Sequence, residues 1–413
     1  MKILVLNSGS SSQKSALYEI GSAIPEHPLQ PLWEGKVEWN GEHGEIHSRN
    51  SRGAIQKTQT QIGSRKQAID QLFDSLCAGE SRAISSLCEI DAVGHRIVHG
   101  GREYQRPTLI TPAVRETLSR LSIFAPLHNR AELEGIQIVE ERFGSIAQIG
   151  VFDTAFHADL PEAAFVYPGP YEWLAQGIRR YGFHGINHQY CAERAAQLLA
   201  KDLRSLQLVT CHLGNGCSLA AIQNGHSIDT TMGFTPLEGL MMGTRSGSVD
   251  PGILTYLMRQ GSLTAADLDT LLNLKSGLLG ISGISGDMRD ILGAMKKGHQ
   301  RARLAFEIFT HRVRSGIGAM IAALGRMDVL VFTAGIGENA AEVRTAASEN
   351  FDYIGLKLDV QRNMQASEDH EISARDSAVR VFVIHAREEW AIAKECWKIT
   401  AAKFGVTSSA GQP

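Results

Sequence analysis

Two short turns built from small residues have the composition of phosphate-binding turns. Residues 7–14 read NSGSSSQK and residues 212–216 read HLGNG, and each stands between two apolar runs. Successive backbone N–H groups in such a turn form a concave anion site. In the first turn, serine hydroxyls and Lys14 add donors and a positive charge. Neither turn matches the P-loop or dinucleotide-binding patterns, and an ordinary hairpin explains either one alone.

A third glycine-containing segment favours nucleotide binding. GIGEN at residues 335–339 follows the apolar run DVLVFT at residues 328–333 and precedes a helical pattern. Ligands of open α/β sheets bind outside the carboxyl ends of strands, where glycine lets the backbone approach a ring or a ribose. A plain strand-to-helix loop is the alternative, but together with the two turns this segment indicates a nucleotide site.

Two arginines lie among glycines and suit an anionic substrate. Arg96 lies in GHRIVHGG (94–101) and Arg245 in MMGTRSGS (241–248). A guanidinium group can bind carboxylate or phosphate oxygens through two parallel hydrogen bonds. A solvated surface position is the alternative for each arginine, but a glycine-flanked loop favours a functional role.

Four further residues could complete such a site. Asp153 follows a strand-like run at 146–152, where it could act as a base or hold a metal-bound water, or cap a helix. His184 lies in RRYGFHG, although a lone histidine is more often structural. Glu388 and Glu389 follow the run VRVFVI and open a terminal helix, where they either complement the helix dipole or bind Mg²⁺.

The elements that would position these residues alternate between strands and helices. Strand patterns occupy residues 3–6, 16–20, 206–222 (a hairpin) and 328–333, and residues 41–64 indicate surface hairpins. Helix patterns occupy residues 66–77, 112–121 and 303–324, and a further helix is expected from about Asn339, after a turn at 334–337. The expected apolar face of the 303–324 helix consists of Leu304, Ile308, Val313, Ile317 and Leu324. The similar strand–turn–strand patterns at 3–20 and 206–222 suggest a duplicated core.

Length and composition limit the class of protein. A chain of 413 residues predicts two domains. The net charge of -3 gives no indication of a nucleic-acid partner, and the absence of long apolar runs predicts neither a membrane span nor a signal peptide. Six cysteines without a CxxC pair indicate reduced, buried thiols rather than a metal site or disulfides. We therefore expect a cytoplasmic protein.

Taken together, the motifs resemble the acetate kinase family, of the superfamily that also contains sugar kinases, actin and heat-shock ATPases. The resemblance runs from Asn7 to Ala393. The segments that carry it, in the order and spacing of the family, are NSGSSSQK, GHRIVHGG, APLHN, VFDTAFH, RRYGFHGINH, HLGNG, DTTMGFTPLEGLMMGTRSG, SGLLGISGISGDMRD and FTAGIGEN. The resemblance implies reversible, direct transfer of the γ-phosphoryl group of ATP to acetate, which gives acetyl phosphate and ADP.

The resemblance also implies a role for each site residue. The ligands of Mg²⁺, or of Mn²⁺ in its place, would be Asn7 and Glu388. The phosphates of ATP and ADP would be bound by Ser10, Ser12, Lys14, His212, Leu213, Gly214, Asn215 and Gly216. The adenosine would be bound by Asp287, Met288, Arg289, Gly335, Ile336, Gly337, Glu338 and Asn339. Acetate would be bound by Arg96 through its carboxylate and by a methyl pocket of Val98, Leu127, Phe183 and Pro236. The phosphoryl group would be stabilised by Arg245 and His184, with Asp153 as acid/base or metal-orienting residue.

Four features depart from the family pattern. Ala386-Arg387 precedes the two glutamates, where Thr-Asn or Thr-Asp is usual, Ser248 stands where an acid or Asn is common, and Ser15 replaces the usual Phe. The segment between Pro161 and Arg179 is shorter than usual. None of these changes falls on a predicted transfer group, so we expect an active enzyme.

The implied fold is α/β, with two actin-like (ribonuclease H-like) domains, a duplicated core and a nucleotide cleft between the domains. We expect residues 1–154 with 388–413 to form the N-terminal domain and residues 155–387 to form the nucleotide-binding domain, and the family implies a homodimer. Three alternatives stay open. They are a kinase for propionate, butyrate or another short-chain carboxylate, a non-catalytic ATP-binding switch of the actin type, and an inactive kinase.

Overall fold

The structure is a computed structural model that describes residues 1–9, 12–40, 43–122, 126–261 and 263–403. The chain divides into two compact units. Unit 1 comprises Met1–Ala155 and the segment from Arg387 onward, and unit 2 comprises Phe156–Ala386. No helix in the described part of the chain is long and apolar enough to cross a membrane. All six cysteines are free thiols. Four of them are buried, as expected, whereas Cys77 is half-buried and Cys88 is exposed.

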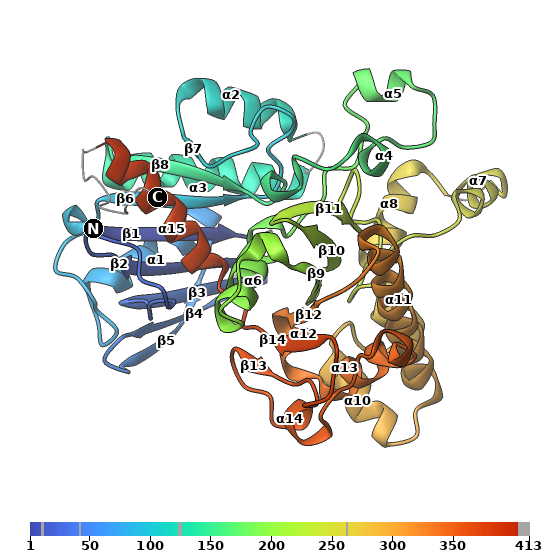
Figure 1. Ribbon diagram of the computed structural model, residues 1–413. Helices are drawn as coiled ribbons and strands as arrows, with labels where there is room; N and C mark the ends of the chain where they lie inside the picture. The colour runs from blue at the N-terminus through green and yellow to red at the C-terminus, as the bar shows by residue number, and fades with distance from the viewer. Residues whose placement is uncertain (10–11, 41–42, 123–125, 262, 404–413) are drawn as a thin grey trace. The chain divides into compact units, whose positions relative to one another are not determined.

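Unit 1 contains an eight-stranded sheet with the order β5-β4-β3-β2-β1-β6-β8-β7 (Figure 1). Its strands are β1 (Lys2–Ser8), β2 (Ser12–Glu19), β3 (Trp33–Asn40), β4 (His43–Asn50), β5 (Ile55–Gln61), β6 (Ala92–Ile97), β7 (Thr108–Leu109) and β8 (Ala147–Phe152). The first five strands form an antiparallel meander. In contrast, β6 pairs in parallel with both β1 and β8. The carboxyl ends of these three strands therefore lie at one edge of the sheet.

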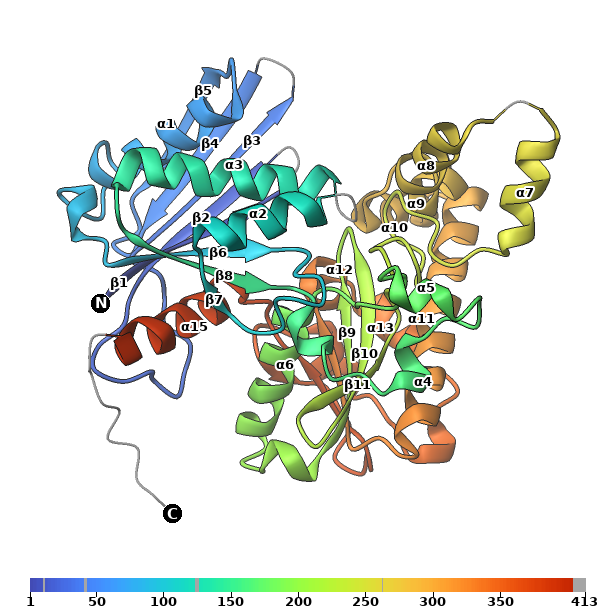
Figure 2. The same cartoon turned by 90° about the horizontal axis from the view of Figure 1, so that it is seen from above.

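Helices cover both faces of this sheet. They are α1 (Arg65–Cys77), α2 (Pro112–Leu121), α3 (Pro126–Phe143) and α15 (Glu388–Lys403), with a 3₁₀ turn at η1 (Leu87–Glu89). Figure 2 shows α1 and α3 on one face and α15 on the other. The alternation of strand side chains explains this arrangement. Leu4 and Leu6 of β1 belong to the core beneath α1 and α3. On the other face, a Cβ at Gly94 of β6 would meet the side chains of Val5 on β1 and Cys396 on α15.

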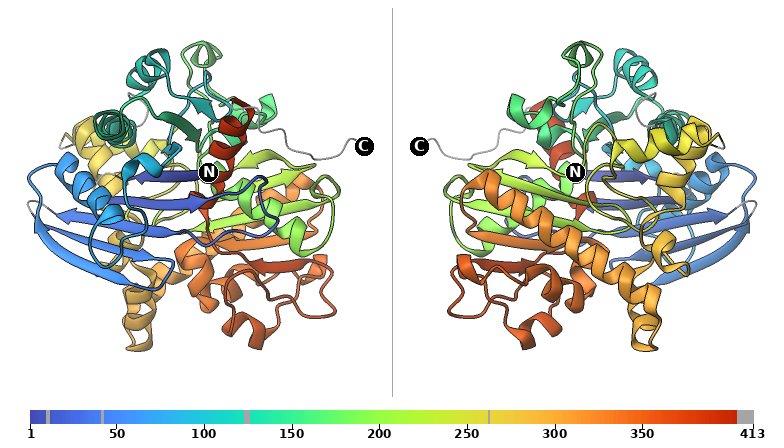
Figure 3. Two further views of the ribbon diagram at one scale, coloured as in Figure 1. Left: turned by 90° about the vertical axis from the view of Figure 1, so that its left-hand side faces the viewer. Right: turned by 90° about the vertical axis from the view of Figure 1, so that its right-hand side faces the viewer.

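Unit 2 contains a six-stranded sheet with the order β11-β10-β9-β12-β14-β13. Its strands are β9 (Gln207–Leu213), β10 (Cys217–Gln223), β11 (His226–Thr230), β12 (Val329–Thr333), β13 (His370–Glu371) and β14 (Arg380–Val383). Its main helices are α6 (Gly185–Leu198), which packs against β9 and β12, and α11 (Gln300–Leu324), which packs against β9, β10 and β11. Figures 2 and 3 show these two helices on opposite faces of the sheet.

The remaining elements of unit 2 are short helices. They are α4 (Glu162–Phe165), α5 (Glu172–Ala175), α7 (Pro251–Arg259), α8 (Ala265–Leu274), α9 (Gly277–Ser282), α10 (Met288–Lys296), α12 (Ala334–Asn339), α13 (Ala341–Ser348) and α14 (Val360–Met364). Three 3₁₀ turns complete the list: η2 (Ala155–His157), which spans the boundary between the units, η3 (Leu203–Ser205) and η4 (Asp352–Ile354).

The two sheets share the same five-stranded core. The order β3-β2-β1-β6-β8 in unit 1 corresponds to β11-β10-β9-β12-β14 in unit 2. In each set the first three strands are antiparallel and the last three are parallel. The α/β class and the duplicated core predicted from the sequence are therefore confirmed.

Two local predictions were wrong. GIGEN is not a turn but part of the helix α12, because the chain changes direction at one residue, Ala334, whose φ is 64°. The α11 helix begins at Gln300, and its expected core residue Leu304 is 49% exposed. The buried face begins instead with the small residues Ala302 and Ala305, which a pattern based on large apolar side chains does not reveal.

Candidate active site

Three parallel strands of unit 1 bring three predicted site residues together. Asn7 lies near the end of β1, Arg96 lies near the end of β6, and Asp153 directly follows β8. Because these strands are parallel neighbours, their carboxyl ends meet at one edge of the sheet. The backbone N–H of Asp153 also donates to the carbonyl of Ile97 at 2.8 Å, which holds Asp153 beside β6.

Arg96 is the central cation of this site. Its Nε and Nη2 donate to the two carboxylate oxygens of Asp153 at 3.2 and 2.5 Å, and its Nη1 donates to Asn7 Oδ1 at 3.1 Å. The Glu388 carboxylate lies 3.7 Å from Arg96 Nε. Burial disfavours the charged guanidinium, but Asp153 and Glu388 outweigh burial and raise the pKa of Arg96. Both carboxylate oxygens of Asp153 are bound by Arg96, so the geometry suits holding this guanidinium group in place.

Asn7 and the start of α15 supply oxygen donors of the kind that Mg²⁺ prefers. Asn7 Nδ2 donates to Glu388 Oε2 and to Glu389 Oε1, each at 3.2 Å. Within the described residues, no group of three or more His, Cys, Asp or Glu side chains is placed to hold a metal. Mg²⁺ typically takes one or two carboxylates and completes its shell with waters and phosphate oxygens, so this sparse oxygen set fits Mg²⁺.

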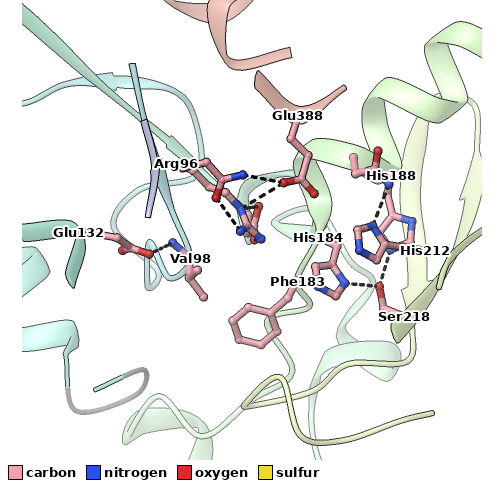
Figure 4. Close-up of polar contacts among 12 residues, drawn as sticks. Arg96, Val98, Glu132, Phe183, His184, His188, His212, Ser218 and Glu388 are labelled. Atoms are coloured by element: carbon pink, nitrogen blue, oxygen red, sulfur yellow. Dashed lines mark hydrogen bonds and ion pairs between the residues drawn. The ribbon is translucent and has the colours of Figure 1, made fainter. Parts of the chain in front are cut away.

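Glu132, a residue that the sequence reasoning missed, lies near this cluster. It projects from α3, is 2% exposed, and accepts a hydrogen bond from the backbone N–H of Val98 at 3.0 Å (Figure 4). Asn129, one helical turn earlier, is 1% exposed. Polar residues at these two positions continue the buried spacing of Ile136 and Val139, and this was the signal available in the sequence.

In unit 2, the second small-residue turn lies beside His184 and Arg245. A Cβ placed on Gly216 would lie 3.3 Å from His184 Nε2 and 3.6 Å from Arg245 Nη1. Arg245 Nη1 also donates to the carbonyl of Pro236 at 3.2 Å, and burial lowers the pKa of Arg245. His212 stacks on His184 with a centroid distance of 3.9 Å. The structure therefore brings together the predicted phosphate turn and both predicted phosphoryl-stabilising residues of this unit.

A buried chain of side chains orients His184 (Figure 4). His184 Nδ1 lies 2.9 Å from Ser218 Oγ, which lies 2.7 Å from His188 Nε2. His188 Nδ1 in turn lies 2.7 Å from Thr210 Oγ1. Burial, together with the neighbouring His157 and His212, lowers the pKa of His188 well below its usual value, so this ring is neutral.

The order of donors in this chain assigns the proton of His184. The Thr210 hydroxyl is fully buried, and His188 is its only side-chain partner in the described part of the protein, so Thr210 donates to His188 Nδ1. His188 Nε2–H then donates to Ser218, and Ser218 donates to His184 Nδ1. A neutral His184 consequently carries its proton on Nε2, the atom beside Gly216.

The predicted adenosine residues are held by local contacts of unit 2. Asp287 caps α10 and forms an ion pair with Arg289 at 2.5 Å, and Met288 is buried. Gly335 to Asn339 form most of α12. Glu338 accepts a hydrogen bond from the backbone N–H of Ala386 at 2.9 Å. Ala386 is one of the two residues that depart from the family pattern. Its hydrogen bond to Glu338 uses only the backbone N–H, so the alanine side chain does not remove this bond.

The remaining predicted residues lie as follows. Val98 and Phe183 are buried, Pro236 is half-buried, Ser12 is half-buried and Lys14 is exposed directly opposite Asn7 in the β1–β2 pair. His212, Leu213, Gly214 and Asn215 belong to the end of β9 and the turn after it. Ser10 and the side chain of Leu127 lie outside the described residues.

Comparison with known proteins identifies the family of this chain. The profile of the acetokinase family matches residues 2–394. The chain belongs to the acetokinase family. It is 57% identical to the acetate kinase of a Cyanothece species, over 97% of this chain and 98% of that protein. It is 56% identical to the acetate kinase of Nostoc punctiforme, over 97% of this chain and 99% of that protein.

Solved structures of the acetokinase family share the fold. The acetate kinase of Porphyromonas gingivalis superposes with a TM-score of 0.89 at 40% identity, with 96% of this chain and 99% of that chain covered. A propionate kinase from Francisella tularensis superposes with a TM-score of 0.86 at 38% identity, with the same coverage. The family assignment made from the motifs is thus confirmed, and both substrates occur among its relatives.

Proposed function

We propose that this protein is an acetate kinase that transfers the γ-phosphoryl group of ATP directly to the carboxylate of acetate, reversibly, to give acetyl phosphate and ADP. The observation that carries this proposal is the similarity to acetate kinases over 97% of the chain. The strand-end cluster around Arg96 in unit 1 and the turn beside Arg245 in unit 2 would supply the groups that the reaction needs.

The acceptor needs no strong base, because a carboxylate is already ionised at neutral pH. Catalysis depends instead on positioning and on neutralising the charge of the transferring phosphoryl group. Arg96 would bind the acetate carboxylate, with Val98 and Phe183 beside the methyl group. Asp153 would hold Arg96 in the binding orientation. Arg245 and the Nε2–H of His184 would donate to the phosphoryl oxygens.

Magnesium is part of this proposal. Asn7 and Glu388 would hold the ion, and Glu389 lies within hydrogen-bond distance of the same Asn7 amide. When bound, Mg²⁺ neutralises phosphate charge and helps to orient the phosphates. The backbone N–H groups of Gly214 to Gly216, and Ser12 and Lys14 from the first hairpin, would bind the phosphates of ATP. Asp287 to Arg289 and Gly335 to Asn339 would bind the adenosine.

Two further features extend the proposal to assembly and location. Helix α7 has no buried residue, and Ile253, Tyr256 and Met258 on it are 47–59% exposed. An apolar surface of this kind marks protein contact, which supports a homodimer.

Free thiols at all six cysteines support a cytoplasmic location. The proposal includes neither nucleic-acid nor membrane partners, and it places the boundary between the two functional domains near residues 154 and 387.

The second candidate function is a propionate kinase. The similarity to the Francisella tularensis propionate kinase favours it, at 38% identity over 96% of the chain. One methylene group contributes only about 1–3 kcal/mol of discrimination in an apolar pocket. The identities of Val98, Phe183 and Pro236 therefore do not separate acetate from propionate, and only a direct comparison of acids does.

The deciding experiment is an assay of the purified protein with ATP, Mg²⁺ and either acetate, propionate or butyrate. Hydroxylamine traps the acyl phosphate as a hydroxamate. We expect the highest kcat/KM with acetate, whereas a higher value with propionate would support the second candidate. An Arg245→Ala variant should lose about 10³–10⁵-fold in turnover. A protein that binds ATP but forms no hydroxamate would instead be a switch or an inactive kinase.

A further inference from the structure

The carboxyl group of Glu132 is an unexplained buried group near the predicted acetate site. Its Oε1 is bound by the Val98 N–H, but its Oε2 is buried without a hydrogen-bond partner among the described residues. The same holds for Oδ1 of Asn129, which lies one helical turn away on the same face of α3. A buried oxygen that accepts no hydrogen bond destabilises the folded protein, and an ionised Glu132 leaves two such oxygens, its own Oε2 and Asn129 Oδ1, next to each other. A proton on Glu132 removes the conflict, because a neutral carboxyl group has a hydroxyl donor.

The charges that face Glu132 come from three neighbouring elements. Arg96 on β6 and Arg65 on α1 favour its ionised form, and Asp153 after β8 disfavours that form. His99, which follows β6, is uncharged at neutral pH because burial lowers its pKa to about 4. Arg96 is already paired with Asp153 and Glu388, and Arg65 with Glu134. Burial dominates the balance and raises the pKa of Glu132 to about 8.

A bound carboxylate makes the charge balance at Arg96 more demanding. Asp153 already pairs with the single guanidinium group of Arg96, and the proposed substrate adds a second negative charge. An ionised Glu132 would add a third in the same buried region, where an uncompensated charge is strongly unfavourable. A neutral Glu132 avoids this repulsion and still accepts the Val98 N–H, which fixes the backbone two residues after Arg96.

We propose that Glu132 is a positioning residue for the carboxylate substrate, and that the substrate binds beside Arg96 only while the Glu132 carboxyl group is neutral. The inference rests on the proposed function, because it assumes that Arg96 binds the substrate carboxylate. It makes acetate binding dependent on pH even though the carboxylate of acetate itself does not titrate in the neutral to alkaline range.

The test compares the wild-type protein with Glu132→Gln between pH 7 and pH 9. Only the neutral fraction of Glu132 is competent to bind, so KM for acetate in the wild type should rise about tenfold across this range while kcat changes little. The amide keeps the acceptor for Val98 and cannot ionise, so KM of Glu132→Gln should stay constant. Glu140→Gln is the matched control. It removes a carboxylate from the same helix, α3, and the Glu140 side chain is 40% exposed. Its partner Arg115 is not among the charges that face Glu132, so this variant should follow the wild type.

Two measurements that need no turnover separate this inference from the proposed kinase activity. Sodium acetate, compared with sodium chloride at equal ionic strength, should raise the thermal unfolding midpoint of the wild type more at pH 7 than at pH 9. It should raise the midpoint of Glu132→Gln equally at both pH values. The second measurement is the stability of the unliganded protein. Since Glu132 keeps a proton that the unfolded chain releases near its ordinary pKa, the wild type should lose stability relative to Glu132→Gln from about pH 5 to pH 8.

The outcomes distinguish the two ideas. An alkaline rise in KM that persists in Glu132→Gln, or equal acetate stabilisation of the wild type at both pH values, would overturn the role of Glu132. Equal pH dependence of stability in both proteins would show that Glu132 is ionised throughout, and this would also overturn it. Acetate stabilisation that weakens at high pH, in a protein that forms no acyl phosphate, would support the inference on Glu132 and count against the kinase proposal.

Discussion

At the scale of single residues, the functional side chains Arg96 and His184 are oriented by neighbouring residues that contact no substrate in the proposed mechanism. Asp153 holds the guanidinium group of Arg96 through both carboxylate oxygens. Ser218 connects His184 to the buried ring of His188. Such partners set the direction in which a functional side chain donates, and they restrict its rotamers. The chemistry assigned to Arg96 and His184 therefore depends on residues with no chemical role of their own.

Replacing Ser218 tests the hydrogen-bond chain that orients His184. Ser218→Ala removes the group that accepts from His188 and donates to His184, so the Nε2–H tautomer of His184 loses its support. We expect kcat to fall by about ten- to a hundredfold and stability to fall by about 1–3 kcal/mol, because buried polar atoms lose their partner. Steady-state kinetics at saturating acetate and ATP, together with urea unfolding, measure both effects.

Ser48→Ala is the matched control for this prediction. Ser48 Oγ on β4 lies 2.7 Å from Ser81 Oγ, and both side chains are buried in unit 1. This variant should lose similar stability but keep kcat within about twofold, since residues that share no contact with the site do not couple to it. Equal losses of kcat in both variants would attribute the effect of Ser218 to stability alone.

At the scale of elements, the sequence predicted those whose signal is local. The helix at 112–121 matches α2, and the predicted hairpin at 206–222 matches β9 and β10, because turn residues and apolar spacing determine them. The α12 helix was missed because its start depends on the left-handed conformation of Ala334, which alanine does not favour on its own. Likewise, the motifs identified Arg96 and Asp153, but not Glu132, whose burial depends on how α3 packs.

The close packing of α15 on β6 leads to a prediction for Gly94. A Cβ at this position would lie 2.5 Å from Cys396 Sγ and 2.7 Å from Ile392 Cγ2, both on α15. Gly94→Ala should therefore destabilise the protein by about 1–3 kcal/mol through overpacking. Gly293→Ala on α10 is the control. Its Cβ would meet no atom within 4 Å, so it should stabilise the helix by about 0.5–1 kcal/mol. Urea unfolding measures both, and a stabilising Gly94→Ala would contradict the packing of α15.

At the scale of the whole molecule, the chain repeats one sheet topology and crosses between its two units twice. Unit 2 is continuous from Phe156 to Ala386, whereas unit 1 needs both ends of the chain. The repetition was visible in the sequence only as two similar strand–turn–strand patterns, because the later strands of each sheet are separated by long and dissimilar insertions. The return of the chain to unit 1 was implied by the family resemblance and not by any local pattern.

This connectivity predicts different behaviour for two fragments. Residues 156–386 contain a complete sheet with α6 and α11 on its two faces, so this fragment should fold alone and unfold cooperatively. Residues 1–155 lack α15, which buries Trp390, Ile392 and Cys396 against the sheet. That face would be left apolar and exposed, so this fragment should aggregate or remain molten. Covalent addition of residues 387–413 through a flexible linker should restore a cooperative transition, measured by near-UV circular dichroism on heating. A well-folded 1–155 fragment would show that α15 is dispensable for unit 1, and that its role is confined to presenting Glu388 and Glu389.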